Sequence, residues 1–144
     1  MSVEENKAIA RRWFEEAFNK HRVAAIDELY TPDFVTHNNP MVPEGNRAGA
    51  KQFFASLFVA MPDLSATVED MVAEGDKVAV RYTTRGTQRG ELMGIPATGK
   101  AVTLTAIDIL RFKGGKIAEH WLEADQLGMM QQLGVIPTPG QAPG

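Results

Sequence analysis

The chain has 144 residues, of which 44% are hydrophobic and 23% are charged, with a formal net charge of −3. This length fits a single domain with a sizeable apolar core, and the slightly acidic balance offers no basic surface for nucleic acid. The absence of cysteine excludes disulfides, thiolate nucleophiles and cysteine metal sites. No signal peptide and no apolar run of about 18 residues is visible, so we expect a cytoplasmic protein without a membrane partner.

A capping box and an apolar stripe predict the first helix. Ser2 and Glu5 have the spacing of the box, and apolar side chains then recur at helical intervals as far as about Lys20. The stripe is explained most simply as core. Trp13 within it is also placed to line a ligand cavity if the core is hollow.

Two further helices are predicted before the first long strand. Residues 23–30 form a short amphipathic segment that Pro32 stops. Residues 46–61 carry phenylalanines, Phe54 and Phe58 among them, on a wide face that indicates burial against a sheet. Between these helices lies a brief extended piece at 34–37. It ends in His37, which is either a surface histidine or a polar group at the mouth of a pocket.

Alternating apolar and polar residues predict a meander of antiparallel strands in the second half of the chain. The strands begin with the alternation at Leu64, Ala66 and Val68, and continue over 77–87 and the two arms of a hairpin within 101–124. Arg81, in the middle of a strand, is either an exposed arginine or a buried partner for a carboxylate or a developing negative charge.

The segments that flank the hairpin have a different character. The irregular connection 90–100 contains apolar residues, including Met93, that either plug a cavity or contact a second subunit. Asp125 is a natural cap for a last helix that Gly134 ends. We expect the domain to span 1–136 and the Pro- and Gly-rich residues 137–144 to form a mobile tail.

Asp108 is the most informative residue, because it is a carboxylate on an otherwise apolar strand face that also carries Leu104 and Leu110. A three-residue turn would place Asp108 opposite His120, whereas a two-residue turn would place it opposite Trp121. The first register is preferred because it puts Arg111 and Glu119 on the same face. No metal-ligand spacing, phosphate loop or nucleophile motif is present.

Three helices, a meander and a closing helix make an α+β pattern. The chain resembles the SnoaL-like polyketide cyclase family, within the cone-shaped fold of ketosteroid isomerase and nuclear transport factor 2. The most specific matching segments are GELMGIPATGK, DILRF, GKIAEHW and QLG, at 90–100, 108–112, 115–121 and 132–134. The resemblance implies a curved antiparallel sheet wrapped around N-terminal helices, an internal apolar pocket, no metal or organic cofactor, and a homodimer.

The resemblance also assigns chemical positions. Polyketide cyclases of this family use an aspartate in the last strand as acid/base and a histidine in the preceding strand, and these positions fall at Leu122 and Asp108. Leucine carries no proton, so that mechanism does not transfer unchanged. Asp108 with His120 is the alternative pair, in which a desolvated carboxylate acts as general acid/base. The competing interpretation is a structural carboxylate tied to Arg81 or to a tyrosine hydroxyl.

The sequence leaves three hypotheses of function. The first is a cofactor-independent enzyme on a small apolar carbonyl, ester or epoxide, in which Asp108 moves the proton, His120 orients it, and Arg81 or His37 polarises an oxygen. The second is a binding protein that retains the pocket, and the third is an association module. The expected pocket lining is Trp13, Phe54, Phe58, Met93, Leu104 and Leu122.

Overall fold

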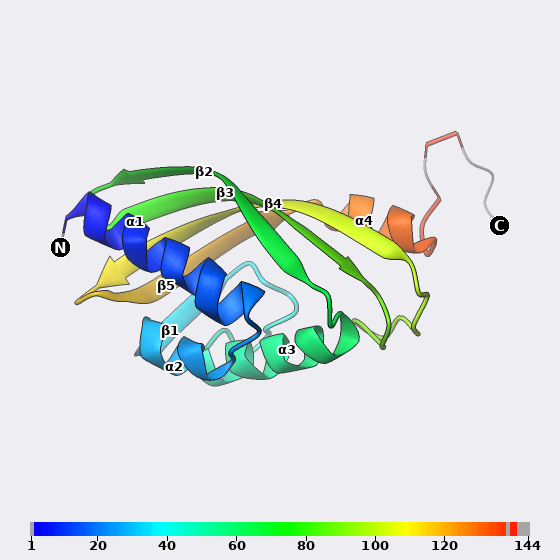
Figure 1. The fold of residues 1–144 in the computed structure, drawn as a ribbon, viewed down its shortest axis with the longest axis horizontal. Coiled ribbons are helices and arrows are strands. Elements are labelled where there is room, and N and C mark those ends of the chain that lie inside the picture. Colours follow the sequence, from blue (N-terminus) through cyan, green and yellow to red (C-terminus); the bar gives the residue numbers. More distant parts are fainter. Residues whose placement is uncertain (1, 138, 141–144) are drawn as a thin grey trace.

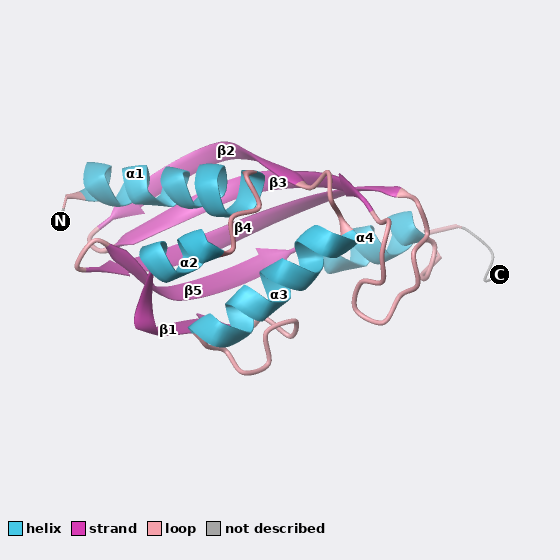
Figure 2. Cartoon of the chain, turned by 60° about the horizontal axis from the view of Figure 1, so that its bottom comes forward, coloured by secondary structure: helices cyan, strands magenta, loops and turns pink. Residues whose placement is uncertain are grey.

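The structure is a computed structural model that describes residues 2–137, 139 and 140. Its centre is a five-stranded curved sheet with the strand order β1-β5-β4-β3-β2. The helices α1, α2 and α3 lie along one face of this sheet, and the opposite face carries no helix among the described residues (Figures 1 and 2). The elements in chain order are α1 (Val3–Arg12), η1 (Trp13–Asn19), α2 (Ala24–Leu29), β1 (Tyr30–His37), α3 (Arg47–Ala60), β2 (Ser65–Glu74), β3 (Lys77–Thr87), β4 (Ala101–Lys113), β5 (Lys116–Ala124) and α4 (Gln126–Leu133).

The first helix begins as predicted, with Ser2 and Glu5 forming a capping box. From Trp13 it continues as the π-helix η1, a rare geometry that often occurs at functional sites. The buried side chains of η1, Trp13, Phe14, Ala17 and Phe18, pack toward the sheet.

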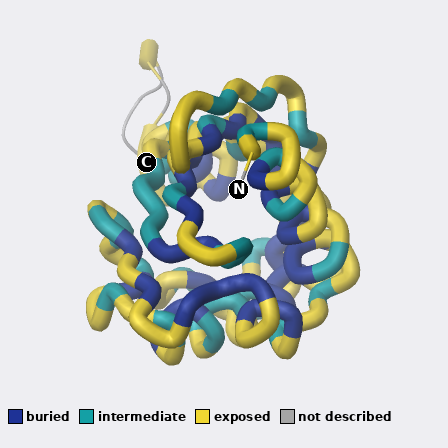
Figure 3. Tube along the Cα trace, turned by 90° about the vertical axis from the view of Figure 1, so that its left-hand side faces the viewer, coloured by how far each residue is buried: buried dark blue, intermediate teal, exposed yellow. Residues whose placement is uncertain are grey.

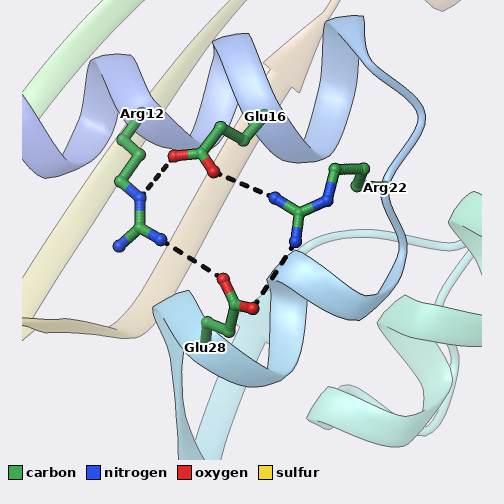
Figure 4. A network of polar contacts seen from close by, with 4 residues as sticks. All are labelled: Arg12, Glu16, Arg22 and Glu28. Atoms are coloured by element: carbon green, nitrogen blue, oxygen red, sulfur yellow. Dashed lines mark hydrogen bonds and ion pairs between the residues drawn. The ribbon is translucent and has the colours of Figure 1, made fainter.

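A charged network joins the first helix to α2. Arg12 contacts Glu16 and Glu28, and Arg22 contacts the same two carboxylates, at 2.9 Å from Nη1 to Glu16 and 3.5 Å from Nη2 to Glu28 (Figure 4). These side chains are half-exposed, so each pair is worth little alone. The four groups close into one ring that links α1, η1 and α2.

Strand β1 corrects one prediction. The second helix ends at Leu29, and the chain is already extended from Tyr30, four residues before the predicted extended piece. β1 pairs with β5 in parallel, which adds a fifth strand to the predicted antiparallel meander. The pairing is interrupted between Tyr30 and Val35, where Pro32 lies, as expected for proline on an edge strand.

The hairpin register also differs from the prediction. Lys113 pairs with Lys116 around a two-residue Gly-Gly turn, and a bulge then lets Arg111 pair with Glu119 while Phe112 pairs with Ile117. The combined shift places Asp108 opposite Leu122, not opposite His120 or Trp121. Because turn and bulge together move the register by two residues, the side chains keep the predicted face. Ile117, next to the bulge, is fully buried.

Buried side chains from the helices and the inner sheet face surround the centre of the molecule (Figure 3). The remaining boundaries agree with the sequence: α3 begins after its cap Asn46, and α4 runs from its cap Asp125 to Gly134. No helix among the described residues combines the length and apolar character that crossing a membrane requires. Most of the predicted tail lies outside the described residues, so its mobility stays a prediction.

Candidate active site

Asp108 lies on the inner face of β4, in the middle of the sheet. Its side chain is 5% exposed. Its neighbours across the sheet are Val80 on β3 and Leu122 on β5. A carboxylate in such apolar surroundings needs polar partners, because burying an unpaired charge is costly.

Polar side chains from three other strands surround this carboxylate. The Tyr82 hydroxyl on β3 donates to Asp108 Oδ1 at 3.0 Å, and His120 Nε2 on β5 lies 3.1 Å from Oδ2. On the far side of the ring, His120 Nδ1 contacts Thr36 Oγ1 on β1 at 2.8 Å. The result is a continuous polar chain, Tyr82–Asp108–His120–Thr36, across an otherwise apolar sheet face.

The side chains of this polar chain differ in how many further hydrogen bonds they can make. Asp108 favours the proton of His120 on Nε2, which leaves Nδ1 to accept from the Thr36 hydroxyl. Both imidazole nitrogens are therefore occupied within the protein. A carboxylate accepts about four hydrogen bonds and Asp108 uses two, so it keeps free capacity for a proton of a bound molecule.

Two buried tyrosines complete the polar set. Burial and the nearby Asp108 carboxylate raise the pKa of Tyr82, and so does the hydrogen bond that Tyr82 donates to Asp108. Burial and the same carboxylate raise the pKa of Tyr30, whereas the Trp13 indole acts in the opposite direction. Both side chains are thus neutral phenols, and each hydroxyl has a proton that it can donate in a hydrogen bond.

A cavity opens beside this polar chain, between the sheet and the helices. The volume of this cavity, measured as the space that the centre of a water molecule can reach, is about 110 Å³. Its walls are mostly apolar. The polar groups in the wall include Asp108, His120, Tyr82, Tyr30 and Thr36. The arrangement therefore holds a proton acceptor and several neutral donors in a space that suits a hydrophobic molecule.

The mouth of the cavity lies between α3, the 90–100 connection and α4. Met41, Phe53, Leu57, Leu92, Met93 and Gln126 line both the cavity and a hollow on the surface. Met93 has a φ of +52° and Leu92 bridges to Ile95, so the connection forms a tight turn over the opening. The fully buried Gln88 fixes this turn, with Nε2 donating to the carbonyls of Ile95 (3.0 Å) and Pro96 (3.2 Å).

Most of the side chains predicted to line a pocket do so. Trp13, Phe54, Met93, Leu104 and Leu122 are all in the cavity wall. Phe58 is not in the wall: it packs one layer behind it, stacked on His21 with ring centroids 4.2 Å apart and in edge contact with Phe18. The helical spacing that grouped Phe54 with Phe58 could not separate wall from second layer.

The two groups predicted to polarise an oxygen lie elsewhere. Arg81 projects from the outer sheet face, is 53% exposed and pairs with Asp70. His37 also lies on the outer face, with Nε2 2.8 Å from Glu119 Oε2 and its ring stacked on Trp121. Strand alternation explains both placements, since each is adjacent in sequence to an inner-face residue, Tyr82 or Thr36.

The sequence predicted a tyrosine hydroxyl as one possible partner of Asp108, and Tyr82 is that tyrosine, but it identified neither Thr36 nor Tyr30 as a member of the site. Tyr82 alternates with Val78 and Val80 on the same side of its strand, which is buried, so the alternation already contained its signal. Thr36 and Tyr30 gave no such signal, because the pairing of β1 with β5 was not predicted. No group of three or more potential metal-ligating residues occurs among the described residues.

Comparison with known proteins places the chain in a family. The SnoaL-like polyketide cyclase family matches residues 8–133. The chain belongs to this family. The match covers every strand, the α4 helix and the second half of α1.

Individual relatives agree with the assignment. The chain is 38% identical over 131 residues to the aklanonic acid methyl ester cyclase DnrD of Streptomyces peucetius, covering 86% of this chain and 88% of DnrD. It is 29% identical over 122 residues to the nogalonic acid methyl ester cyclase of Streptomyces nogalater, covering 82% and 90%. These relatives support the expectation of a SnoaL-like enzyme of the cyclase type.

Solved structures confirm the cone-shaped α+β fold. TsrD of Streptomyces laurentii superimposes with a TM-score of 0.85 at 32% identity, over 94% of this chain and 99% of TsrD. IdmH of Streptomyces antibioticus gives a TM-score of 0.76 at 34% identity, over 90% and 98%. The curved sheet around N-terminal helices is therefore a feature that this SnoaL-like chain shares with them.

Proposed function

We propose that this SnoaL-like protein closes a ring in a polyketide-derived ester or a related enolisable carbonyl compound, with Asp108 as the general acid/base. The observation that carries the proposal is the buried Asp108, which faces an apolar cavity with free hydrogen-bonding capacity. The relatives named above act, by their names, on the methyl esters of nogalonic acid and aklanonic acid, and an ester group is neutral and suits such a cavity.

The reaction proceeds in two proton transfers. Asp108 removes a proton from the carbon next to a carbonyl group, and the electron pair of the broken C–H bond forms an enolate. The enolate carbon attacks a second carbonyl carbon of the same molecule, which forms the ring bond and an alkoxide. The alkoxide takes the proton back from Asp108, so the product is an isomer of the substrate and no oxidant is required.

The positions of the carboxylate and the histidine relative to those of the family support this role for Asp108. By the resemblance, the family aspartate falls at Leu122 and its assisting histidine at Asp108. In the structure Leu122 is the direct cross-strand partner of Asp108, so a carboxylate on β4 lies next to the position of one on β5. His120, two residues from Leu122 on the same face, supplies the histidine.

Aklanonic acid and nogalonic acid methyl esters are the substrates to test first, with ring closure followed by liquid chromatography and mass spectrometry. We expect turnover by the wild type and a decrease in kcat of about 10²–10⁴-fold in Asp108→Asn. Asp70→Asn, which removes an outer-face carboxylate, is the matched control and should keep full activity. Tight binding without turnover of any ester would instead indicate a non-catalytic binding protein.

A second proposal concerns assembly and location. We propose that the protein is a cytoplasmic homodimer in which the helix-free face of the sheet forms the interface. The support is the exposure of Ile107 (48%), Ile109 (40%) and Val72 (65%) on that face.

A further inference from the structure

We infer that the Tyr30 hydroxyl is the group that binds the substrate oxygen on which negative charge develops, and that Trp13 positions it. This inference rests on the proposed function, because it assigns to the same cavity the partner that Asp108 needs. It also narrows the substrate to a carbonyl compound whose enolate oxygen accepts a hydrogen bond, rather than an epoxide.

The two cavity tyrosines differ in how they use their protons. Tyr82 donates to Asp108 Oδ1 at 3.0 Å, so its hydroxyl proton is already engaged. Tyr30 is 3% exposed and lines the same cavity, and its hydroxyl, unlike that of Tyr82, is not bound to the Asp108 carboxylate. A hydroxyl proton in an apolar cavity wall that no carboxylate engages gains a strong acceptor when an anionic oxygen binds.

The ring of Tyr30 is held on both sides. It stacks on Phe34 with centroids 3.9 Å apart and lies parallel to Trp13 with centroids 6.3 Å apart and an interplanar angle of 1°. Tyr30 is also the first residue of β1 and pairs with the fully buried Ile117. Its hydroxyl is therefore fixed before any ligand binds, which is the condition for effective stabilisation of a developing charge.

Trp13 provides the second, independent observation. Its Nε1 is buried and has no hydrogen-bond partner in the described residues, although the side chain lines the cavity. Burial and Asp108 raise the pKa of Tyr30, and the Trp13 indole opposes them, which is the effect of an N–H directed at the Tyr30 oxygen. An Nε1–H group that donates to Tyr30 Oη leaves the Tyr30 proton free to point at a ligand. Trp13 is thus a positioning residue, and the π-helix η1 begins at this residue.

Charge explains why a phenol suits this place. The Asp108 carboxylate lies close enough to Tyr30 to disfavour a second negative charge there, so the hydroxyl remains protonated. Once Asp108 has taken the substrate proton it is neutral, and the enolate oxygen becomes the local anion. A neutral donor then stabilises the enolate without having competed for the carboxylate.

The test uses a ligand that mimics the enolate and does not depend on turnover. 2-Naphthol carries an acidic hydroxyl on a flat apolar frame, and 2-methylnaphthalene has nearly the same shape without the oxygen. Asp108→Asn provides the background, because its neutral side chain imitates the protein after proton removal. Dissociation constants are measured by isothermal titration calorimetry, and circular dichroism checks that each variant is folded.

We expect Tyr30→Phe on this background to weaken 2-naphthol binding about tenfold and to leave 2-methylnaphthalene within twofold. Tyr82→Phe should change 2-naphthol binding by less than about threefold. Trp13→Phe should weaken it about threefold when Tyr30 is present and have no further effect in Tyr30→Phe, which a purely structural role of Trp13 would not produce.

Three results would overturn the assignment. They are unchanged 2-naphthol affinity in Tyr30→Phe, an equal loss for both ligands, and a larger loss in Tyr82→Phe than in Tyr30→Phe. The outcome is separable from the proposed function: absence of ester turnover by the wild type contradicts the reaction, whereas the naphthol series decides the donor alone.

Discussion

At the scale of single residues, the site depends on one cross-strand pair. Asp108 and Leu122 are directly opposite each other on the inner face, and His120 reaches the carboxylate from two residues further along β5. Side chains directly opposite on neighbouring antiparallel strands have Cβ atoms about 5 Å apart. Two carboxylates at this distance cannot both ionise easily, so Leu122 is compatible with Asp108 in a way that a second aspartate is not.

Leu122→Asp tests this incompatibility. The introduced carboxyl is forced toward its neutral form by Asp108 and by burial, so it binds a proton more tightly in the folded than in the unfolded state. Stability relative to Leu122→Asn should therefore be equal near pH 4 and fall as pH rises, by about 1–3 kcal/mol at pH 7. Urea denaturation across this pH range measures the difference.

The control for this prediction is a double variant. Adding Asp108→Asn removes the facing charge, so the pH-dependent part of the loss in Leu122→Asp should shrink to what burial alone causes. A pH dependence that is unchanged by Asp108→Asn would mean that the two positions do not interact, which contradicts the geometry of the site.

What could be predicted at this scale follows from strand alternation. The alternation put Asp108 and His120 on one inner face, and the structure confirms that they are in contact. It could not identify Tyr30 or Thr36, because their place in the site depends on the parallel pairing of β1 with β5. Arg81 and His37 were wrong as pocket residues because the alternation puts each on the outer face, next in sequence to the inner-face residues Tyr82 and Thr36.

At the scale of elements, the hairpin shows where prediction from sequence fails. The two glycines at the turn are compatible with loops of either two or three residues, and each choice shifts the register by one. The bulge at Ala118 has no distinctive sequence signal, since it inserts an ordinary small residue. Element types and approximate bounds were predictable, whereas the exact cross-strand partner of Asp108 required the structure.

The junction of β1 and β5 carries polar pairs on both faces. Thr36 binds His120 on the inside, and on the outside Glu119 lies between His37 Nε2 at 2.8 Å and Arg111 Nε at 2.5 Å. The hydrogen bond from His37 and that from Arg111 lower the pKa of Glu119. The outer pairs thus help to hold the parallel edge strand whose inner face supplies Thr36 and Tyr30.

Glu119→Gln should lower the melting temperature at pH 7 by about 1–3 °C. Because the folded-state pKa of Glu119 is lowered, its stabilising effect is present above the ordinary glutamate pKa of about 4.3 and is lost as pH falls through the folded-state value. The difference between variant and wild type should therefore vanish near pH 3, as measured by thermal unfolding followed by circular dichroism.

Glu123→Gln provides the comparison, because this glutamate is exposed on the same strand and outer face. It should have little effect at either pH. An equal loss in both variants at pH 7 would attribute the effect to general charge on β5 and would contradict the specific role of Glu119.

At the scale of the whole molecule, the two faces of the sheet differ in what covers them. The inner face is covered by helices (Figure 1) and encloses the cavity. The outer face carries an apolar strip that consists of the exposed Val72, Ile107 and Ile109 and the half-buried Trp121. The ion pairs Arg81–Asp70 and Arg111–Glu119 flank this strip. An apolar centre with a polar rim is the usual anatomy of an interface, and paired charges of both signs permit a second copy to pack without repulsion.

The dimer proposed above can be tested by placing a charge at the centre of the strip. Ile109→Asp should convert a dimer into a monomer, because a carboxylate in an apolar interface loses its hydration without gaining a partner. Size-exclusion chromatography with light scattering gives the mass of both proteins at several concentrations. Val59→Asp is the matched control, since this valine is 78% exposed on α3 and lies away from the outer sheet face.

A wild-type protein that is monomeric at about 100 µM would disprove the dimer, and an Ile109→Asp protein that remains dimeric would move the interface to another surface. A folded Ile109→Asp monomer should still bind ligand, because the polar groups of the cavity come from one chain: Asp108, His120, Tyr82, Tyr30 and Thr36.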